Sequence, residues 1–509
     1  MHMICKVSSA DLFGASVFDV CVEADVAGGL PGFYMVGLPS NEVREAKERV
    51  IRAIVNSGFS FPARKVTINL SPAYIPKHGS GLDLPIAVSI LAAMGELDPA
   101  SLKGKLFIGE LSLDGSVNKV RGALPITAHA AGADYSAIVL PEGNAFEGAA
   151  VEGIRVHKTS SLKEIVSDLN CGREKDVDHV DIEAMLDNAC TETGIDFADI
   201  YGQESAKKAT LTAVSGFHNI LYIGPPGAGK SMMARRIPTI FSRMTRSECI
   251  EVSMIYSIAG MLEDEKLILE RPFRAPDQGI TEAALIGGTS SLKPGEITLA
   301  HRGVLFLDEF SQFKRNTIDM LRAPLENGSI VINRVSGSTE FPCSFMLAAA
   351  TNPCPCGHYP DRRFCSCTES EVSRFLSRIK GPVLDRIDIC VGMSKVNAED
   401  LRSAANGMTS KDMREMADKA INIQKKRFAG SSVIFNSQMN RHMIKEFCVL
   451  DKDTLSVLNK AYERFNMSAR GWYKVIKVAR TLADLEERER IDKKDVLEAL
   501  GYRNDLLDH

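Results

Sequence analysis

The sequence is poor in aromatic residues and lacks both a strong net charge and a long hydrophobic run. Aromatic residues make up 6% of its 509 residues, with a single tryptophan. The net charge of −4 gives no overall basic field, so any binding of nucleic acid needs a local patch. The chain also has no stripe of alternating aromatic and basic residues, which is typical of proteins that stack single-stranded nucleic acid.

The shortage of apolar runs argues against secreted and membrane-spanning proteins. The N-terminal segment MHMICKVSSADLFGASVF lacks the apolar stretch of a secretory signal. The longest apolar window, LPIAVSILAAMGEL at residues 84–97, is too short and too interrupted to cross a bilayer. We therefore expect a cytoplasmic protein with no membrane partner, in which thiols stay reduced.

The pattern along the chain predicts an α/β protein of three domains. At ~150 residues per domain, this length allows about three domains. Residues 1–170 mix short strands and helices, whereas residues 171–197 are charged and predict a linker with some helix. Strands and helices alternate around glycine-rich turns over residues 198–395, which favours a parallel sheet. Residues 396–509 have helical periodicity and predict a small helical bundle.

The segment NILYIGPPGAGKSMMARR determines the class of the protein. It predicts a strand over residues 220–223, a glycine-rich loop and a helix, which is the setting that the pattern G-x-x-x-x-G-K-S requires. The loop residues are Gly224, Pro225, Pro226, Gly227, Ala228, Gly229, Lys230 and Ser231. Backbone N–H groups of such a loop bind phosphates, the lysine reaches the β- and γ-phosphates, and the serine ligates Mg²⁺. The sequence therefore predicts a nucleoside triphosphatase.

Two further strand ends are expected to complete this site. GVLFLDEF predicts a strand that is buried on both faces and ends in Asp308 and Glu309. An acid at this edge is suited to hold the Mg²⁺ shell, and the next acid to polarise the attacking water. FMLAAATN predicts the next strand of the sheet, with the amide of Asn352 at its tip, where it can orient the water or contact the γ-phosphate.

Two arginines are candidates for contact with the γ-phosphate. Arg386 lies in GPVLDRIDI, just before an apolar strand, and Arg470 lies in SARGWYKVIKVAR, near the start of a helix. A guanidinium binds a phosphate through two donors. In a ring, an arginine from the neighbouring subunit increases the rate by roughly 10³–10⁵-fold. A surface salt bridge is the competing interpretation for each arginine.

Four cysteines follow the FMLAAATN strand, in TNPCPCGHYPDRRFCSC. Cys354, Cys356, Cys365 and Cys367 form the pattern C-x-C-x₈-C-x-C. Four thiolates suit tetrahedral Zn²⁺, and His358 is a candidate to replace one of them. A structural zinc site is favoured over a reduced loop without metal, and a disulfide is disfavoured in a reducing compartment.

Residues 329–345, SIVINRVSGSTEFPCSF, predict a β-hairpin with its turn at Ser336, Gly337 and Ser338. Arg334, next to the turn, is a candidate for contact with a phosphate backbone. A solvated charge is an equally weighted interpretation of Arg334.

Taken together, these motifs resemble those of a known family. The order GPPGAGKS, FRAPDQGITEAALIGG, PGEITLAHRGVLFLDEF, AATNPCPCG, LDRIDI and SARG is similar to that of the magnesium-chelatase-like AAA+ ATPases of the YifB/ComM family. The segments FYMVGLPSNEVREAKERV and HGSGLDLPIAV match the same family, so the resemblance covers nearly the whole chain.

The resemblance implies ATP and Mg²⁺ as cofactors and a homo-oligomeric, hexameric ring with ATP between subunits. It implies an AAA+ core with an insertion at residues 259–300 and a hairpin that lines the pore, followed by a helical lid. It implies that Lys230 and Ser231 are phosphate-loop residues, that Asp308 is the metal-binding acid and that Glu309 is the catalytic acid. It also implies that Asn352 is sensor one, Arg386 the arginine finger and Arg470 sensor two. ComM-type members are implicated in natural transformation, as motors that drive branch migration of DNA.

The N-terminal domain also resembles the proteolytic domain of Lon, with its ribosomal S5 domain 2-like fold, and the C-terminal part of RadA. A Lon-type protease needs a serine nucleophile and a lysine base. The Lon pattern P-K-D-G-P-S-A-G aligns with residues 76–81, which puts Gly81 at the nucleophile position and Ser80 one place early. Leu124 stands at the position of the base. We therefore expect no protease activity, and a structural or DNA-contacting role.

Three functions share this ATPase core. A DNA motor, acting as a helicase or in branch migration, is the leading hypothesis. A magnesium-chelatase-like ATPase that remodels a protein partner is disfavoured by the extra N-terminal domain, and an unfolding chaperone by the lack of an evident aromatic pore loop.

Overall fold

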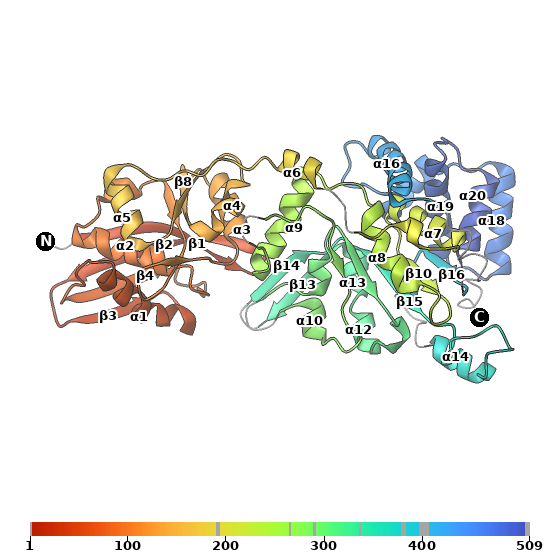
Figure 1. Ribbon diagram of the computed structural model, residues 1–509, viewed down its shortest axis with the longest axis horizontal. Helices are drawn as coiled ribbons and strands as arrows, with labels where there is room; N and C mark the ends of the chain where they lie inside the picture. The colour runs from red at the N-terminus through yellow and green to blue at the C-terminus, as the bar shows by residue number, and fades with distance from the viewer. Residues whose placement is uncertain are drawn as a thin grey trace.

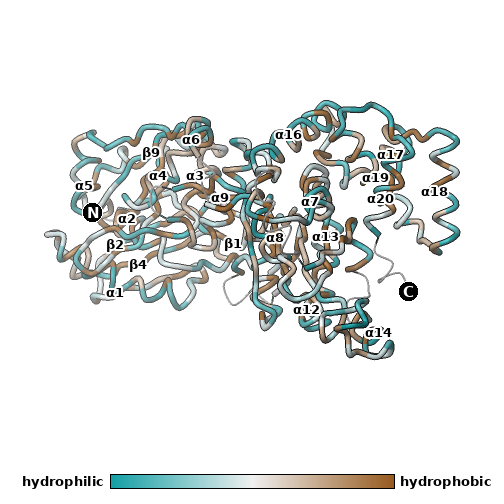
Figure 2. The backbone as a smooth tube through the Cα atoms, turned by 45° about the vertical axis from the view of Figure 1, so that its right-hand side comes forward, coloured by the Kyte–Doolittle hydropathy of each residue, from teal (hydrophilic) through white to brown (hydrophobic). Residues whose placement is uncertain are grey.

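Two β-sheets and a helical bundle follow one another along the long axis of the molecule (Figure 1). The computed structural model describes residues 3–189, 194–263, 266–288, 292–334, 337–377, 383–395 and 407–503. Apolar segments concentrate in the sheets and inner helices, and hydrophilic segments in the outer loops (Figure 2). In the described part of the chain, every helix is too short or too polar to cross a bilayer.

The N-terminal sheet is built on a long antiparallel pair, β1 and β2, which cross the whole domain. The strand order is β3-β4-β2-β1-β5-β8-β9. The strands are β1 Met3–Phe13, β2 Ser16–Ala27, β3 Gly32–Val36, β4 Lys65–Ser71, β5 Lys105–Phe107, β8 Ala137–Pro141 and β9 Arg155–Thr159; a separate small pair is β6 Glu110–Leu111 and β7 Val117–Asn118. The segment KVTINLS, in which apolar and polar residues alternate, forms β4.

Helices cover both faces of this sheet. The helices on one face are α1 Asn41–Asn56, α2 Asp83–Met94 and α5 Leu162–Cys171, and those on the other are α3 Ala123–Gly132 and α4 Ala145–Ala149. The side chain of Ser40 caps α1 by accepting a hydrogen bond from the backbone N–H of Val43. Helix α2 is buried on nearly all sides, because its sequence is apolar all round.

The central sheet is parallel and has the strand order β11-β12-β15-β10-β16. Its strands are β10 Ile220–Ile223, β11 Phe273–Arg274, β12 Val304–Leu307, β15 Met346–Thr351 and β16 Ile389–Gly392. Alternate residues enter two different cores: Ile220 and Tyr222 face one, and Leu221 and Ile223 face the other. This sheet is therefore covered on both faces, as the predicted apolar strands require.

The core that contains Ile220 and Tyr222 joins the central sheet to the C-terminal bundle. It packs α7 Glu204–Gly216 and α8 Lys230–Ile240 against the bundle helices. The bundle consists of α16 Ser410–Arg427, α17 Arg441–Phe447, α18 Lys452–Arg464, α19 Ala469–Leu485 and α20 Lys493–Gly501. The helical prediction for this region is confirmed, although the expected boundary at residue 396 lies outside the described residues.

The N-terminal sheet shares a core with the ATPase half of the chain. Helix α9, Arg246–Ala259, packs against α3, and Val252 and Ile255 lie in one apolar cluster with Leu106 and Ile138 of the N-terminal strands. Helix α6, Ile182–Asn188, which falls in the predicted linker, contributes Ile182 and Leu186 to the same cluster.

The predicted hairpin forms, but its register differs from the prediction. Strands β13 Ser329–Arg334 and β14 Gly337–Pro342 pair Arg334 with Gly337. Gly337 and Ser338 therefore belong to the return strand, and the predicted turn at Ser336, Gly337 and Ser338 is wrong. The connection is at residues 335–336, outside the described residues, as is the side chain of Arg334.

This hairpin packs against the turn between β1 and β2 (Figure 1). The backbone N–H of Ala15 donates to Oγ1 of Thr339 across 3.1 Å. Gly337 lies so close to Phe13 that a Cβ atom at this position would be 2.4 Å from the ring. The hairpin that the resemblance assigns to the pore is therefore in direct contact with the N-terminal domain.

Candidate functional site

The phosphate loop connects β10 to α8 at the carboxyl edge of the central sheet. Gly227 and Gly229 have φ angles of +77° and +88°, which other residues seldom adopt. Lys230 opens α8, and its Nζ donates to the carbonyls of Gly224 and Pro225 at 2.7 and 2.9 Å. Burial lowers the pKa of Lys230, while Asp308 and Glu309 act in the opposite direction.

Both predicted acids follow β12 at the same edge. The hydroxyl of Ser231 donates to Oδ2 of Asp308 across 2.6 Å, so the two expected Mg²⁺ ligands already face each other. Glu309 is exposed and has a φ angle of +49°, which is uncommon for a residue with a side chain. Strained backbone of this kind clusters at functional sites.

Asn352 lies between these two groups because β15 lies between β12 and β10. Its Oδ1 accepts a hydrogen bond from Nζ of Lys230 across 3.1 Å. The loop, the two acids and Asn352 line one cavity of about 460 Å³, which is within the usual size range of ligand pockets. The sequence reasoning missed Ser311 and Gln312, which also line it; their only signal is their position directly after LDEF.

The arrangement fits a nucleotide with its metal. The loop presents backbone N–H groups beside a buried ammonium, and a hydroxyl and a carboxylate meet where a Mg²⁺ ion needs oxygen ligands. Glu309 and Asn352 border the same cavity. A base and an amide at that position can hold and orient a water molecule.

Neither predicted arginine lies in this cavity. Arg386 precedes β16, and its backbone carbonyl accepts a hydrogen bond from Asn219, which precedes β10. Both arginines contact Glu326 of α13, Arg322–Asn327: Nη2 of Arg386 lies 2.6 Å from Oε2, and Nη2 of Arg470 lies 2.9 Å from Oε1. The hydrogen bond from Arg386 is the main cause that lowers the pKa of Glu326.

The arginines border a second cavity of about 470 Å³, together with Lys474 and Lys477. Arg386 is 7% exposed, whereas the side chain of Arg470 is half exposed. Burial lowers the pKa of both lysines. Sequence reasoning missed Glu326 and the two lysines; the lysines stand one helical turn apart in the segment that follows Arg470.

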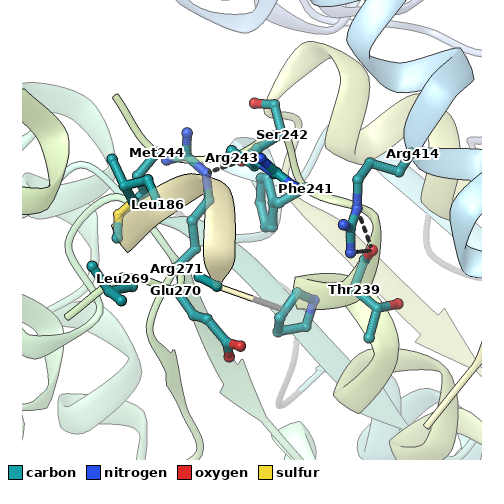
Figure 3. Close-up of a pocket in the computed structure, with 12 residues that line it drawn as sticks. Leu186, Thr239, Phe241, Ser242, Arg243, Met244, Leu269, Glu270, Arg271 and Arg414 are labelled. Carbon is teal, nitrogen blue, oxygen red and sulfur yellow. Dashed lines mark hydrogen bonds between the residues drawn. The ribbon is translucent and has the colours of Figure 1, made fainter. Parts of the chain in front are cut away.

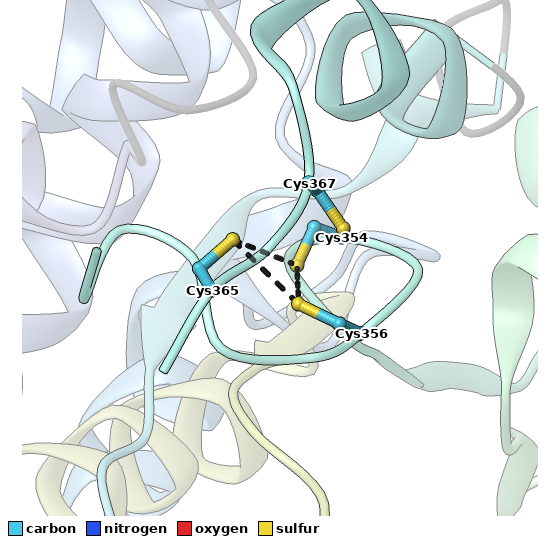
Figure 4. Close-up of side chains that lie close together, drawn as sticks. All are labelled: Cys354, Cys356, Cys365 and Cys367. Carbon is cyan, nitrogen blue, oxygen red and sulfur yellow. Dashed lines mark hydrogen bonds between the residues drawn. The ribbon is translucent and has the colours of Figure 1, made fainter. Parts of the chain in front are cut away.

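The four cysteines converge on one point (Figure 4). Their sulfur atoms all lie within 4.8 Å of one another. Cys354, Cys365 and Cys367 are buried and Cys356 is half-buried. His358 does not belong to this group, since its ring packs beside Phe364 instead.

A third cavity, of about 750 Å³, is lined mainly by residues of the N-terminal domain, among them Ser80, Glu110 and Asp11, and also by Ile258 of α9 and by Lys293. The hydroxyl of Ser80 donates to the carboxylate of Glu110. Burial raises the pKa of Asp11 to about 7. Leu124, at the position of the Lon base, is fully buried.

A small hollow lies where the linker, the ATPase core and the lid meet (Figure 3). Leu186, Phe241 and Arg414 border it, and Nε of Arg414 donates to the carbonyl of Thr239 across 2.9 Å. Its volume of about 40 Å³ has room for little more than a water molecule. The hollow therefore marks a junction of three parts of the chain and is too small for a ligand.

Three family models match most of the chain. "Magnesium chelatase, subunit ChlI" matches residues 196–401, "Subunit ChlI of Mg-chelatase" matches residues 22–144, and the model of the C-terminal part of subunit ChlI matches residues 407–503.

Curated relatives align along nearly the full length. The competence protein ComM of Haemophilus influenzae is 38% identical over 488 residues, which are 95% of this chain and 94% of the relative. The uncharacterized protein YifB of Salmonella typhimurium is 36% identical over 491 residues, 96% of this chain and 95% of the relative. The magnesium-chelatase 38 kDa subunit of Cereibacter sphaeroides is 27% identical over 175 residues, 31% of this chain and 52% of the relative.

Membership of this group points to an ATPase of the AAA+ type, which agrees with the phosphate loop and the acids beside it. The matches extend from the N-terminal sheet through the nucleotide cavity to the C-terminal helices, so no single motif carries the assignment. The chain therefore belongs to the YifB/ComM family of magnesium-chelatase-like proteins.

Proposed function

We propose that this protein is an ATP-hydrolysing ring motor that acts on DNA, as a helicase or in branch migration. The observation that carries the ATPase part is the convergence of Lys230, Ser231, Asp308, Glu309 and Asn352 on one cavity. The DNA part rests on the resemblance to ComM-type motors and on the name of one full-length relative, a competence protein.

Each residue of the cavity has a role that its position supports. The loop backbone and Lys230 bind the triphosphate, and Ser231 and Asp308 hold Mg²⁺, which neutralises charge on the phosphates. Glu309 removes a proton from the attacking water. Asn352 orients this water and keeps Lys230 in place through their hydrogen bond.

The positions of the arginines support an assembly of several copies. Arg386 and the phosphate loop lie at opposite ends of β10 and its neighbour β16. Four strand residues span about 13 Å, and Arg386 is bound to Glu326 on the far side. We assign Arg386 and Arg470 to the nucleotide of a neighbouring subunit, in a homo-oligomeric ring that the family implies to be a hexamer.

The exposed side chains that the structure describes on the hairpin are Val331, Asn333, Ser338 and Glu340, of which one is an anion. The side chain of Arg334, the candidate for a contact with a phosphate backbone, lies outside the described residues. For the N-terminal domain we propose a Lon-like fold without protease activity, in which Ser80 faces the carboxylate of Glu110.

The test is the rate of ATP hydrolysis with and without single-stranded, duplex and forked DNA. We expect DNA to stimulate turnover in the wild type at low salt and the effect to fall steeply as salt rises. Lys230→Ala is the control for contaminating ATPases. A wild-type protein that hydrolyses ATP, binds no DNA at low salt and is not stimulated by it would contradict the DNA motor.

The second candidate is an ATPase that remodels a protein partner. The family models, which carry the name of a magnesium chelatase subunit, favour it. An ATPase unaffected by DNA but stimulated by a purified partner protein would decide for this function.

A further inference from the structure

The sulfur atoms of the cysteine cluster have the spacing of ligands around a single metal ion. The Sγ atom of Cys354 lies 3.3 Å from that of Cys356 and 3.9 Å from that of Cys365, and the latter two are 3.6 Å apart. With a Zn–S bond of about 2.3 Å, a tetrahedral site places its sulfurs about 3.8 Å apart. A four-iron cluster binds each thiolate to a different iron and holds them farther apart.

The loop that carries these cysteines touches the phosphate loop at two points. Asn352, two residues before Cys354, accepts the hydrogen bond from Lys230. Gly357, between Cys356 and Cys365, lies against Pro226, since a Cβ atom on Gly357 would be 2.4 Å from Cδ of Pro226. The φ angle at position 357, +83°, also favours glycine.

From these two observations we infer that Cys354, Cys356, Cys365 and Cys367 bind one Zn²⁺ ion, and that the closed loop clamps the phosphate loop. The metal joins the two ends of the segment 354–367, so the stretch that bears Gly357 cannot move away from Pro226. Asn352 is held by the same closure. Zinc is then a positioning element of the nucleotide site, and this inference rests on the proposed ATP binding at that site.

The first measurement is the metal content of the full-length protein purified without chelator. We expect about one zinc ion per chain, lost in the double variant Cys365→Ser/Cys367→Ser and retained in Cys171→Ser, whose cysteine is exposed and outside the cluster. The affinity for a fluorescent ATP analogue with Mg²⁺ should fall at least about tenfold in the double variant, since small displacements of positioning groups are costly, and stay unchanged in Cys171→Ser.

A second route covers a double variant that fails to fold. Wild-type protein is dialysed against a zinc chelator until the metal is gone, and its affinity for the analogue is measured before and after zinc is restored. Iron in place of zinc, or far less than one zinc per chain, would overturn the metal site. Unchanged affinity in verified zinc-free protein would overturn the clamp.

These outcomes are independent of the proposed DNA motor. The metal content and the nucleotide affinity are measured without DNA, so a protein that DNA fails to stimulate would still show or lack the zinc clamp.

Discussion

At the scale of residues, the proposed nucleotide site assigns binding and hydrolysis to different side chains of the cavity. Lys230 is buried against loop carbonyls, whereas Glu309 is exposed at the cavity edge with strained backbone. Replacing Lys230 should therefore affect nucleotide binding, and replacing Glu309 should affect hydrolysis.

We expect Glu309→Gln to retain nucleotide affinity and to lower the rate of hydrolysis by roughly 10²–10⁴-fold, because the amide cannot accept the proton of the water. Lys230→Ala should lose nucleotide binding itself. Titration of a fluorescent ATP analogue and the release of phosphate measure the two effects. A Glu309→Gln protein with undiminished turnover would remove Glu309 from the role of base.

Arg386 gives a test of the shared site. Arg386→Ala should bind ATP normally but turn it over roughly 10³-fold more slowly, as in other enzymes that lose an arginine finger. Mixing it with Lys230→Ala should restore part of the activity, since each Lys230→Ala subunit supplies its arginine to an intact cavity. Failure of every mixture to recover activity, with both proteins assembled, would speak against a site shared between subunits.

The sequence motifs contain the residues of the cavity. They do not contain Glu326, which binds both arginines at the opposite edge of the sheet. Lys230, Asp308 and Asn352 stand at motif positions whose strands could be recognised from apolar runs. Glu326 lies in no motif, and only the folded chain shows that it binds both arginines. In the single chain both arginines form a salt bridge with Glu326, at a buried position for Arg386 and a half-exposed one for Arg470, and their contact with a γ-phosphate stays a prediction.

At the scale of elements, the β13–β14 hairpin depends on a contact from the other end of the sequence. The sequence VSGS contains several residues that favour turns, and the local pattern placed Gly337 and Ser338 in the turn instead of in the return strand. The register instead agrees with the fit of Gly337 against Phe13 and of Thr339 against Ala15. Helix α1, by contrast, follows its apolar stripe and cap closely, because both signals are local.

Thr339→Val should lower the free energy of unfolding by about 1 kcal/mol, because the backbone N–H of Ala15 loses its acceptor while the side chain keeps its shape. Denaturation by urea measures this change. Ser338→Ala, on the exposed side of the same strand, is the matched control and should change little. Equal stabilities of the two variants would show that the contact with Ala15 is unimportant.

At the scale of the whole molecule, the N-terminal domain and the ATPase half are joined by a common core. The pattern along the chain predicted a domain at residues 1–170 and a charged linker at residues 171–197. It did not predict the shared core, because contacts between distant segments leave no local periodicity. The buried faces of α6 and α9 complete the apolar cluster of the N-terminal sheet, so the two parts support each other.

A truncated protein that begins at residue 194 should therefore expose the face of α9 that carries Val252 and Ile255. A newly exposed apolar patch of this kind promotes association, and we expect aggregates in light scattering. The same truncation with Val252→Ser and Ile255→Ser should be less aggregated. A monodisperse truncated protein without these substitutions would show that the shared core is dispensable.

Glu326 binds Arg386 through one oxygen and Arg470 through the other, and this single carboxylate links the fates of the two cations. In the proposed ring, an adjacent triphosphate that drew both guanidinium groups toward itself would leave Glu326 as an uncompensated anion between subunits. This carboxylate would compete for the same cations once the terminal phosphate departed. Under that proposal, Glu326 would return the two arginines to their resting contacts after each round of hydrolysis.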